Sequence, residues 1–199
     1  MPKYLSTTWY VVCLLATVPP AQSHAQQVRT PGSSGEIALS EESVQLRYVR
    51  PRLQGSIEAA QLGFGLFLNE ERDIVASSNY YVEASRLRFN RLTILVGPVA
   101  YAALLSEENT DIFALGLGAE ARFRLLRDPE VTIVGRAVYA PDILTFGSAD
   151  NVWDVIGRAE IPITDRVTGF GGFRLFEIDL LQGKTELEES VHLGLRYLF

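Results

Sequence analysis

His192, Ser190 and Glu188 are the residues of this chain whose types could support catalysis. They occupy alternate positions of the terminal segment, so on a β-strand they share one face. A histidine could serve as general base and a serine as nucleophile. Neighbours on one face of a strand lie about 7 Å apart, whereas a nucleophile needs to lie within about 3 Å of its base. We therefore predict no catalytic residue from this strand alone, since a partner from another strand would be needed.

Charged residues alternate with apolar ones in several other segments. Between Ile112 and Leu125 one face is apolar, while the opposite face carries glycines followed by Glu120, Arg122 and Arg124. A helix, with its period of 3.6, would mix these two sets. The predicted interior polar network comprises Glu120, Arg122, Arg124, Arg136, Arg158, Glu160, His192 and Arg196, and Arg47 and Glu83 share its inward face. Three interpretations remain open: an internal salt-bridge network, a polar passage for a small solute, or a lipid-modifying hydrolase site.

The elements that would position these residues are β-strands. Period-two alternation recurs with turn signals between segments, and no stretch is apolar for long enough to form a membrane helix. The pattern predicts an all-β fold, an antiparallel up-and-down transmembrane β-barrel of ten strands, with eight as the alternative count. The predicted strands are 36–40, 44–50, 58–69, 73–84, 92–104, 112–126, 131–140, 152–163, 167–181 and 187–199. In 167–181 the apolar set shifts phase around 169–172, which predicts a bulge there.

The predicted connections differ in length. The segments 127–130 and 164–166 are tight turns, which we assign to the periplasmic side together with the C-terminus. The segments 106–111, 140–151 and 182–186 are longer or more acidic and are assigned to the outer surface. A soluble β-sandwich would use the same alternation and is the structural alternative.

The N-terminus is typical of an export signal. Lys3 precedes the short apolar stretch 10–18, which ends at a Pro pair, and 23–25 is a small-residue cleavage site. We predict a signal peptide at 1–25, a short flexible leader at 26–35 and the barrel at 36–199. Cys13, the only cysteine, lies inside the signal, so disulfides and thiolate metal sites are excluded from the mature chain. We predict no metal and no cofactor.

The formal net charge of −6 argues against a nucleic-acid partner, which would require a basic face. The final residues VHLGLRYLF alternate up to a terminal Phe. They resemble the assembly signal of bacterial outer-membrane barrels, carried here by His192, Gly194, Tyr197 and Phe199. The resemblance implies that the barrel-assembly machinery and outer-membrane lipid are partners, and that the protein is integral to the outer membrane.

Three stretches together resemble the YfaZ family of outer-membrane proteins: 139–142 (YAPD), 115–120 (LGLGAE) and the terminal strand 191–199. The resemblance covers about 36–199 and implies an outer-membrane β-barrel without established chemistry. The expected function is a small integral barrel with a structural or surface-interaction role. A narrow channel for small solutes is the first alternative, and a lipid-modifying hydrolase using His192 is the second.

Overall fold

The computed structural model describes residues 32–54, 58–86, 91–106, 110–127, 129–180 and 183–199. The predicted signal peptide and most of the predicted leader lie outside these residues. The described chain is almost entirely β-strand, built from segments rich in β-branched and aromatic residues. The strands are β1 (Ser34–Leu39), β2 (Ser43–Gln54), β3 (Glu58–Asn69), β4 (Ile74–Arg86), β5 (Leu92–Leu105), β6 (Thr110–Arg127), β7 (Glu130–Ala140), β8 (Thr145–Phe146), β9 (Ala149–Pro162), β10 (Val167–Leu180) and β11 (Gly183–Leu198).

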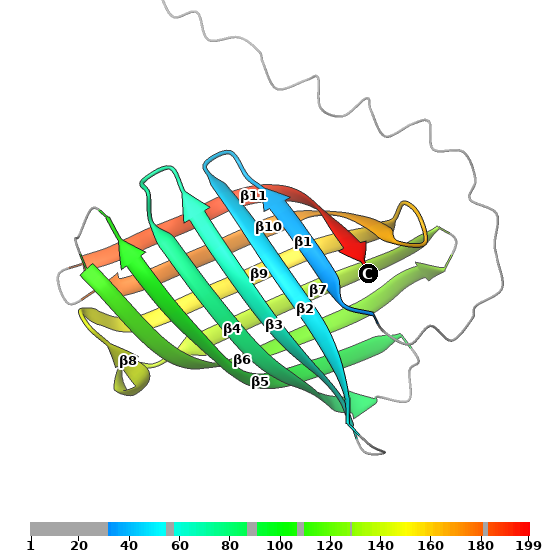
Figure 1. Ribbon diagram of the computed structural model, residues 1–199, viewed down its shortest axis with the longest axis horizontal. Helices are drawn as coiled ribbons and strands as arrows, with labels where there is room; N and C mark the ends of the chain where they lie inside the picture. Colours follow the sequence, from blue (N-terminus) through cyan, green and yellow to red (C-terminus); the bar gives the residue numbers. More distant parts are fainter. Residues whose placement is uncertain (1–31, 55–57, 87–90, 107–109, 128, 181–182) are drawn as a thin grey trace, which may run out of the picture. The chain divides into compact units, whose positions relative to one another are not determined.

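The strands close into an antiparallel barrel (Figure 1). Each of ten strands pairs with its neighbour in the chain, and β1 pairs with β11 to close the ring. In Figure 1 the red C-terminal strand lies beside the blue first strand at this seam. The two-residue strand β8 is not part of the ring of ten. It pairs with Phe113 and Ala114, near the start of β6. The predicted ten-strand antiparallel barrel is therefore confirmed, and the count of eight is wrong.

The connections divide between two ends of the barrel. One end, here called the terminal end, holds both barrel termini, the turn 163–166 and the adjoining strand ends Gln54, Glu58, Arg86, Leu92, Arg127 and Glu130. The other end, here called the loop end, holds the connections 40–42, 70–73 and 141–148 and the strand ends Leu105, Thr110, Leu180 and Gly183. The predicted tight turns thus share an end with the C-terminus. The segment 182–186 is not a long loop, because β11 already begins at Gly183.

The loop-end connections are shaped by local hydrogen bonds. In 70–73 the turn is stabilised by the Asn69 side chain, which accepts a 2.8 Å hydrogen bond from the Asp73 amide. Arg72 adopts the left-handed region at φ 68° within this turn. The connection 141–148 contains the short 3₁₀ helix η2 (Asp142–Leu144) and then β8, with Gly147 at φ 99°. This segment extends the sheet beside β6, where β7 has already ended.

The alternation of faces follows the sequence in nearly every strand. Along β6 the odd-numbered side chains from Asp111 to Leu125 are exposed, and the even-numbered ones as far as Glu120 are buried. In β10 the inward set Phe170, Gly172, Arg174 and Phe176 runs without a break, so the bulge predicted at 169–172 is wrong. The register shift against β11 lies instead between Phe176 and Glu177. Its extra residue is Leu187, which has no partner on β10.

Candidate functional site

An apolar plug fills the loop end of the barrel interior. Its side chains come from β3 to β7 and from β9 to β11, and each is 8% exposed or less. Phe176 lies at its centre, fully buried, with its ring 5.7 Å from that of Phe67 and 5.8 Å from that of Tyr101. The plug comprises Phe67, Val75, Tyr81, Leu95, Val99, Tyr101, Ala103, Leu105, Ile112, Ala114, Val138, Ala140, Ala149, Val152, Phe176, Ile178 and Leu187.

An ion-pair cluster, here called the seam cluster, lies inside the barrel where β1 meets β11. Arg196 Nε donates to Glu36 at 2.6 Å, and its Nη atoms donate to both oxygens of Glu160 at 2.6 and 2.8 Å. Arg158 donates from Nη1 to Glu36 and from Nε to Glu160, both at 2.9 Å. The Arg158 guanidinium also lies 4.4 Å from the ring centroid of Phe170. Two arginines and two carboxylates thus satisfy one another almost completely.

A second cluster, here called the plug cluster, lies directly against the apolar plug. Asp154 accepts hydrogen bonds from Arg174 at 3.0 Å, from Arg136 at 3.3 Å and from the Tyr101 hydroxyl at 2.9 Å. Arg174 also donates to Glu188 at 3.2 Å, and its guanidinium lies 4.4 Å from the ring centroid of Phe176. Arg174 therefore joins the charged interior to the plug, through both an ion pair and an aromatic contact.

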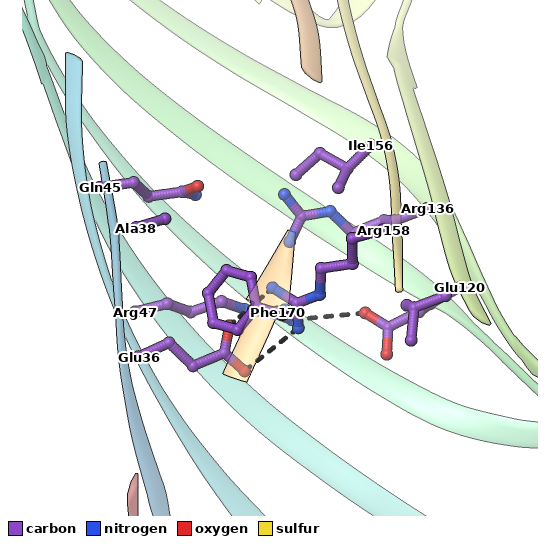
Figure 2. Close-up of a pocket in the computed structure, with 10 residues that line it drawn as sticks. Glu36, Ala38, Gln45, Arg47, Glu120, Arg136, Ile156, Arg158 and Phe170 are labelled. Atoms are coloured by element: carbon purple, nitrogen blue, oxygen red, sulfur yellow. Dashed lines mark hydrogen bonds and ion pairs between the residues drawn. The ribbon is translucent and has the colours of Figure 1, made fainter. Parts of the chain in front are cut away.

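Arg47 and Glu120 lie between the two clusters. Glu120 is held by Arg122 Nε at 2.7 Å and by Arg47 Nη2 at the longer distance of 3.6 Å. Figure 2 shows Arg47 and Glu120, with Arg136 and Arg158, around one small cavity. This cavity and a neighbouring one, both lined by Arg47 and Arg136, each have about 10 Å³, room for roughly one water.

Three buried donors line these cavities and make no hydrogen bond to any residue that the structure describes. They are Arg47 Nη2, Asn79 Nδ2 and Arg136 Nε. Buried donors in native proteins almost always have an acceptor, often an ordered water. We therefore expect each cavity to hold a water molecule bound to these groups.

The terminal end of the interior opens into a larger hollow of about 310 Å³, here called the vestibule. It is lined by Arg91, Thr93, Arg122, Arg124, Glu130, Thr132, Glu160, Pro162, Thr168 and Arg196. Arg124 Nε lies 3.2 Å from Glu130 at the rim, where both side chains are 46% exposed. The interior thus changes along the axis from an apolar plug, through packed ion pairs, to a polar open mouth.

The predicted network residues do not all take part in one cluster. Arg158, Glu160 and Arg196 meet in the seam cluster, Glu120 and Arg122 pair beside it, and Arg136 joins the plug cluster. Arg124 faces the same way but lies at the rim, paired with Glu130 outside the packed interior. Arg47 is buried, and Glu83 is partly buried on the inward face of β4.

His192 lies inside the barrel but makes no catalytic geometry with its strand neighbours. It is 5% exposed, and its ring contacts Phe170 at 6.1 Å, while Nδ1 has no partner among the described residues. The Ser190 hydroxyl donates to Glu188 at 3.0 Å rather than to His192. Of the other residues in the predicted assembly signal, Gly194 packs against Phe170 inside, whereas the rings of Tyr197 and Phe199 pack edge to face outside, with their centroids 5.3 Å apart.

Four members of the clusters were absent from the predicted network: Glu36, Asp154, Arg174 and Glu188. Each is buried and ion-paired. Their signal was available, because Asp154 shares a face with Arg158, and Glu188 shares one with His192. Arg174 was missed because the glycines at 169, 171 and 172 carry no side chain that indicates the face of the strand, and the apolar Phe170 between them points inward.

The described residues contain no group of three or more His, Cys, Asp or Glu side chains that could hold a metal ion. In the same part of the chain, no helix is long and apolar enough to cross a membrane.

No family model and no curated protein matches this chain. Solved structures that resemble it include a bacterial polysaccharide outer membrane secretin, at 11% identity and a TM-score of 0.49 over 79% of this chain. They also include the outer membrane channel DcaP of Acinetobacter baumannii, at 7% identity and a TM-score of 0.43 over 85% of this chain. The KdgM porin in complex with disordered oligogalacturonate matches 84% of this chain at 7% identity and a TM-score of 0.43.

The chain spans 57% of the secretin chain, 60% of the DcaP chain and 99% of the porin chain. With TM-scores below 0.5, these matches define neither a family nor an activity for this protein. The function is therefore argued from its own residues.

Proposed function

We propose that the chain is a small integral β-barrel of the bacterial outer membrane. Support comes from its outer surface, where exposed apolar side chains occur on every strand of the ring. Leu117, Val191 and Leu193 are each more than 60% exposed there. Such a continuous apolar surface is typical of contact with lipid, and a closed barrel satisfies its backbone groups within the bilayer. Paired aromatics near the strand ends, Tyr139 with Trp153 and Tyr197 with Phe199, suit the two membrane interfaces.

The rest of the location proposal concerns export and assembly. It includes cleavage of the signal at 1–25, recognition of the terminal strand by the barrel-assembly machinery, and a relationship to the YfaZ family. Cell fractionation tests the location, with samples run unheated and boiled in SDS. We expect a fast-migrating unheated band in the outer-membrane fraction. A protein in the soluble periplasmic extract without a heat-dependent shift would overturn the membrane assignment.

We propose further that this barrel is closed and has a structural or surface-interaction role. The observation that carries this proposal is the apolar plug, whose centre, Phe176, is fully buried beneath the loop end. The paired charges of the plug cluster lie against it, and the cavities beside Arg47 and Arg136 have room for roughly one water each. A hydrated solute has no room in such a space.

The loop end offers a surface for the proposed surface-interaction role. Acidic side chains on its connections and adjoining strand ends are exposed or half-buried: Glu41, Glu42, Glu70, Glu71, Asp111, Asp142, Asp150, Glu177 and Asp179. This acidic rim suits cationic groups, or phosphates bridged by divalent cations.

Planar bilayer recording tests the closed interior. We expect purified protein to give no discrete single-channel steps. Reproducible steps from wild-type protein would instead support the alternative, a narrow channel for small solutes. In that case Arg136→Ala and Arg158→Ala should each change the ion selectivity of the steps.

The hydrolase alternative depends on His192. Because the Ser190 hydroxyl donates to Glu188, a nucleophile for His192 would have to come from elsewhere. The test is the lipid profile of outer membranes from cells that carry His192→Ala. We expect the profile to match that of wild-type cells, and accumulation of an uncleaved lipid would revive the hydrolase.

A further inference from the structure

The vestibule collects hydrogen-bond donors from adjacent strands at one level of the barrel. Thr93 on β5 is the register partner of Arg122 on β6, and Arg124 is the partner of Thr132 on β7. On the opposite wall Thr168 is the partner of Arg196. Register therefore places each of three inward threonines beside an arginine, and these pairs surround one hollow of about 310 Å³. That volume lies at the lower end of the range for small-ligand sites.

The arginines of the vestibule use their donors differently from those deeper in the barrel. Arg158, Arg174 and Arg196 each hold carboxylates through both Nε and the Nη atoms. Arg122 and Arg124 hold theirs through Nε, which leaves the Nη donors of both side chains outside those contacts. A guanidinium has five donors, so half-used arginines retain the fork that binds an oxyanion.

Arg91 adds a cation at the rim. Its carbonyl oxygen accepts a 2.8 Å hydrogen bond from the Arg124 amide, so the two backbones are adjacent. The Arg91 side chain is exposed, and no hydrogen bond or ion pair of it is found with another side chain that the structure describes. Two guanidinium groups, from Arg91 and Arg124, thus border the same opening.

The carboxylates of the vestibule are already engaged. Both oxygens of Glu160 accept hydrogen bonds from Arg196, and one of them also accepts from Arg158. Glu130 is paired with Arg124. Because the acceptors are held and the donors are in surplus, the chemistry of the hollow favours an anion over a cation.

We propose that the vestibule is a binding site for a phosphate group, with Arg91 and Arg124 as its rim contacts and Arg122 deeper inside. Arginine forks match the geometry of phosphate oxygens, and the threonine hydroxyls supply further donors. The phosphate comes either from a soluble phosphorylated compound or from the headgroup of an anionic phospholipid at this end of the barrel.

Isothermal titration of inorganic phosphate into purified protein, in a zwitterionic detergent at low salt, tests the site. We expect saturable binding that weakens about tenfold in each of Arg91→Gln and Arg124→Gln, from the loss of one charged hydrogen-bonding partner. Both side chains are exposed, so these variants should keep the heat-dependent gel shift. Arg166→Gln is the matched control, since Arg166 is an exposed arginine of the same end outside the vestibule lining. Binding that is equal in all three variants and wild type would overturn the proposal.

A second arm identifies the source of the phosphate. The thermal unfolding of the protein is compared in nanodiscs of phosphatidylcholine with and without phosphatidylglycerol. Stabilisation by phosphatidylglycerol that Arg91→Gln and Arg124→Gln abolish, and Arg166→Gln keeps, assigns the site to a headgroup, whether or not free phosphate binds. Phosphate binding that is unaffected by the lipid assigns it to a soluble ligand. If wild-type protein neither binds phosphate nor responds to phosphatidylglycerol, the site does not exist.

Discussion

Glu36 and Arg196 are register partners across the closing pair of strands and form an ion pair of 2.6 Å inside the barrel. They lie 160 positions apart in the chain. Arg158, from β9, contacts the same Glu36 carboxylate at 2.9 Å. The buried carboxylate of Glu36 therefore links β1 both to β11 and to β9.

The first prediction concerns this seam. Glu36→Gln is expected to destabilise the barrel by about 3–5 kcal/mol, because it removes the shared partner of two buried arginines. Urea unfolding in detergent, followed by the gel shift, measures the loss. Glu130→Gln is the control, since its pair with Arg124 is half exposed and contributes about 1 kcal/mol or less. Equal unfolding midpoints for the two variants would contradict a structural role of the seam cluster.

The second prediction concerns the apolar plug. Phe176→Ala removes a fully buried ring that packs against Phe67 and Tyr101, and should cost about 3–5 kcal/mol. Phe173→Ala, on the outward face of the same strand and 45% exposed, should cost much less. Thermal unfolding of the two variants in detergent compares them directly. A smaller loss for Phe176→Ala than for Phe173→Ala would mean that the plug is not packed.

The third prediction separates the groups that surround Asp154. Tyr101→Phe removes one hydrogen bond of 2.9 Å and should cost about 1 kcal/mol, since Arg136 and Arg174 still hold the carboxylate. Asp154→Asn leaves both arginines without that carboxylate and should cost about 3–5 kcal/mol. Denaturant unfolding measures both. Similar losses for the two variants would place the stabilisation in the tyrosine rather than in the ion pairs.

The fourth prediction distinguishes packing from recognition at Gly194. A methyl group there would contact the Phe170 ring and the Ile37 carbonyl at less than 3 Å, so Gly194→Ala should destabilise the purified barrel by about 1–3 kcal/mol. Gly157→Ala, whose methyl group would meet open space on the outer face, should be neutral or slightly stabilising. Refolding of both variants from urea into detergent tests this. Normal stability of Gly194→Ala in vitro, together with failed assembly in cells, would assign Gly194 to recognition alone.

Much of the fold could be predicted because strand faces alternate strictly. The boundaries of β3 match the predicted range, and the inward position of Glu120 followed from the glycines and charges on its side of β6. The phase of β10 was missed because Phe170 turns inward to contact Arg158, a position that its apolar side chain does not indicate. The short strand β8 was missed because two residues are too few to show a period.

The partners within the clusters could not be predicted in the same way. Alternation tells which side chains point inward but not which of them meet across the barrel. The contact of Arg158 with Glu36 spans 122 positions and depends on the strand tilt and the width of the ring. The rim position of Arg124 likewise follows from how far β6 extends beyond β5, whose first residue, Leu92, pairs with Phe123.

Leu187 is an extra residue that divides β11 into two segments. The alternation of inward and outward side chains in one segment does not continue in phase into the other. On its loop side the strand follows one frame against β10, and from Glu188 onward it follows another. Leu187 and Glu188 are both buried, so this single step adds consecutive residues to the plug and to the charged interior. A one-residue insertion or deletion in the loop-side half could be absorbed at this step. The C-terminal half would then keep His192, Gly194 and Arg196 facing inward, and this would let the loop change length during evolution while the seam stays in frame.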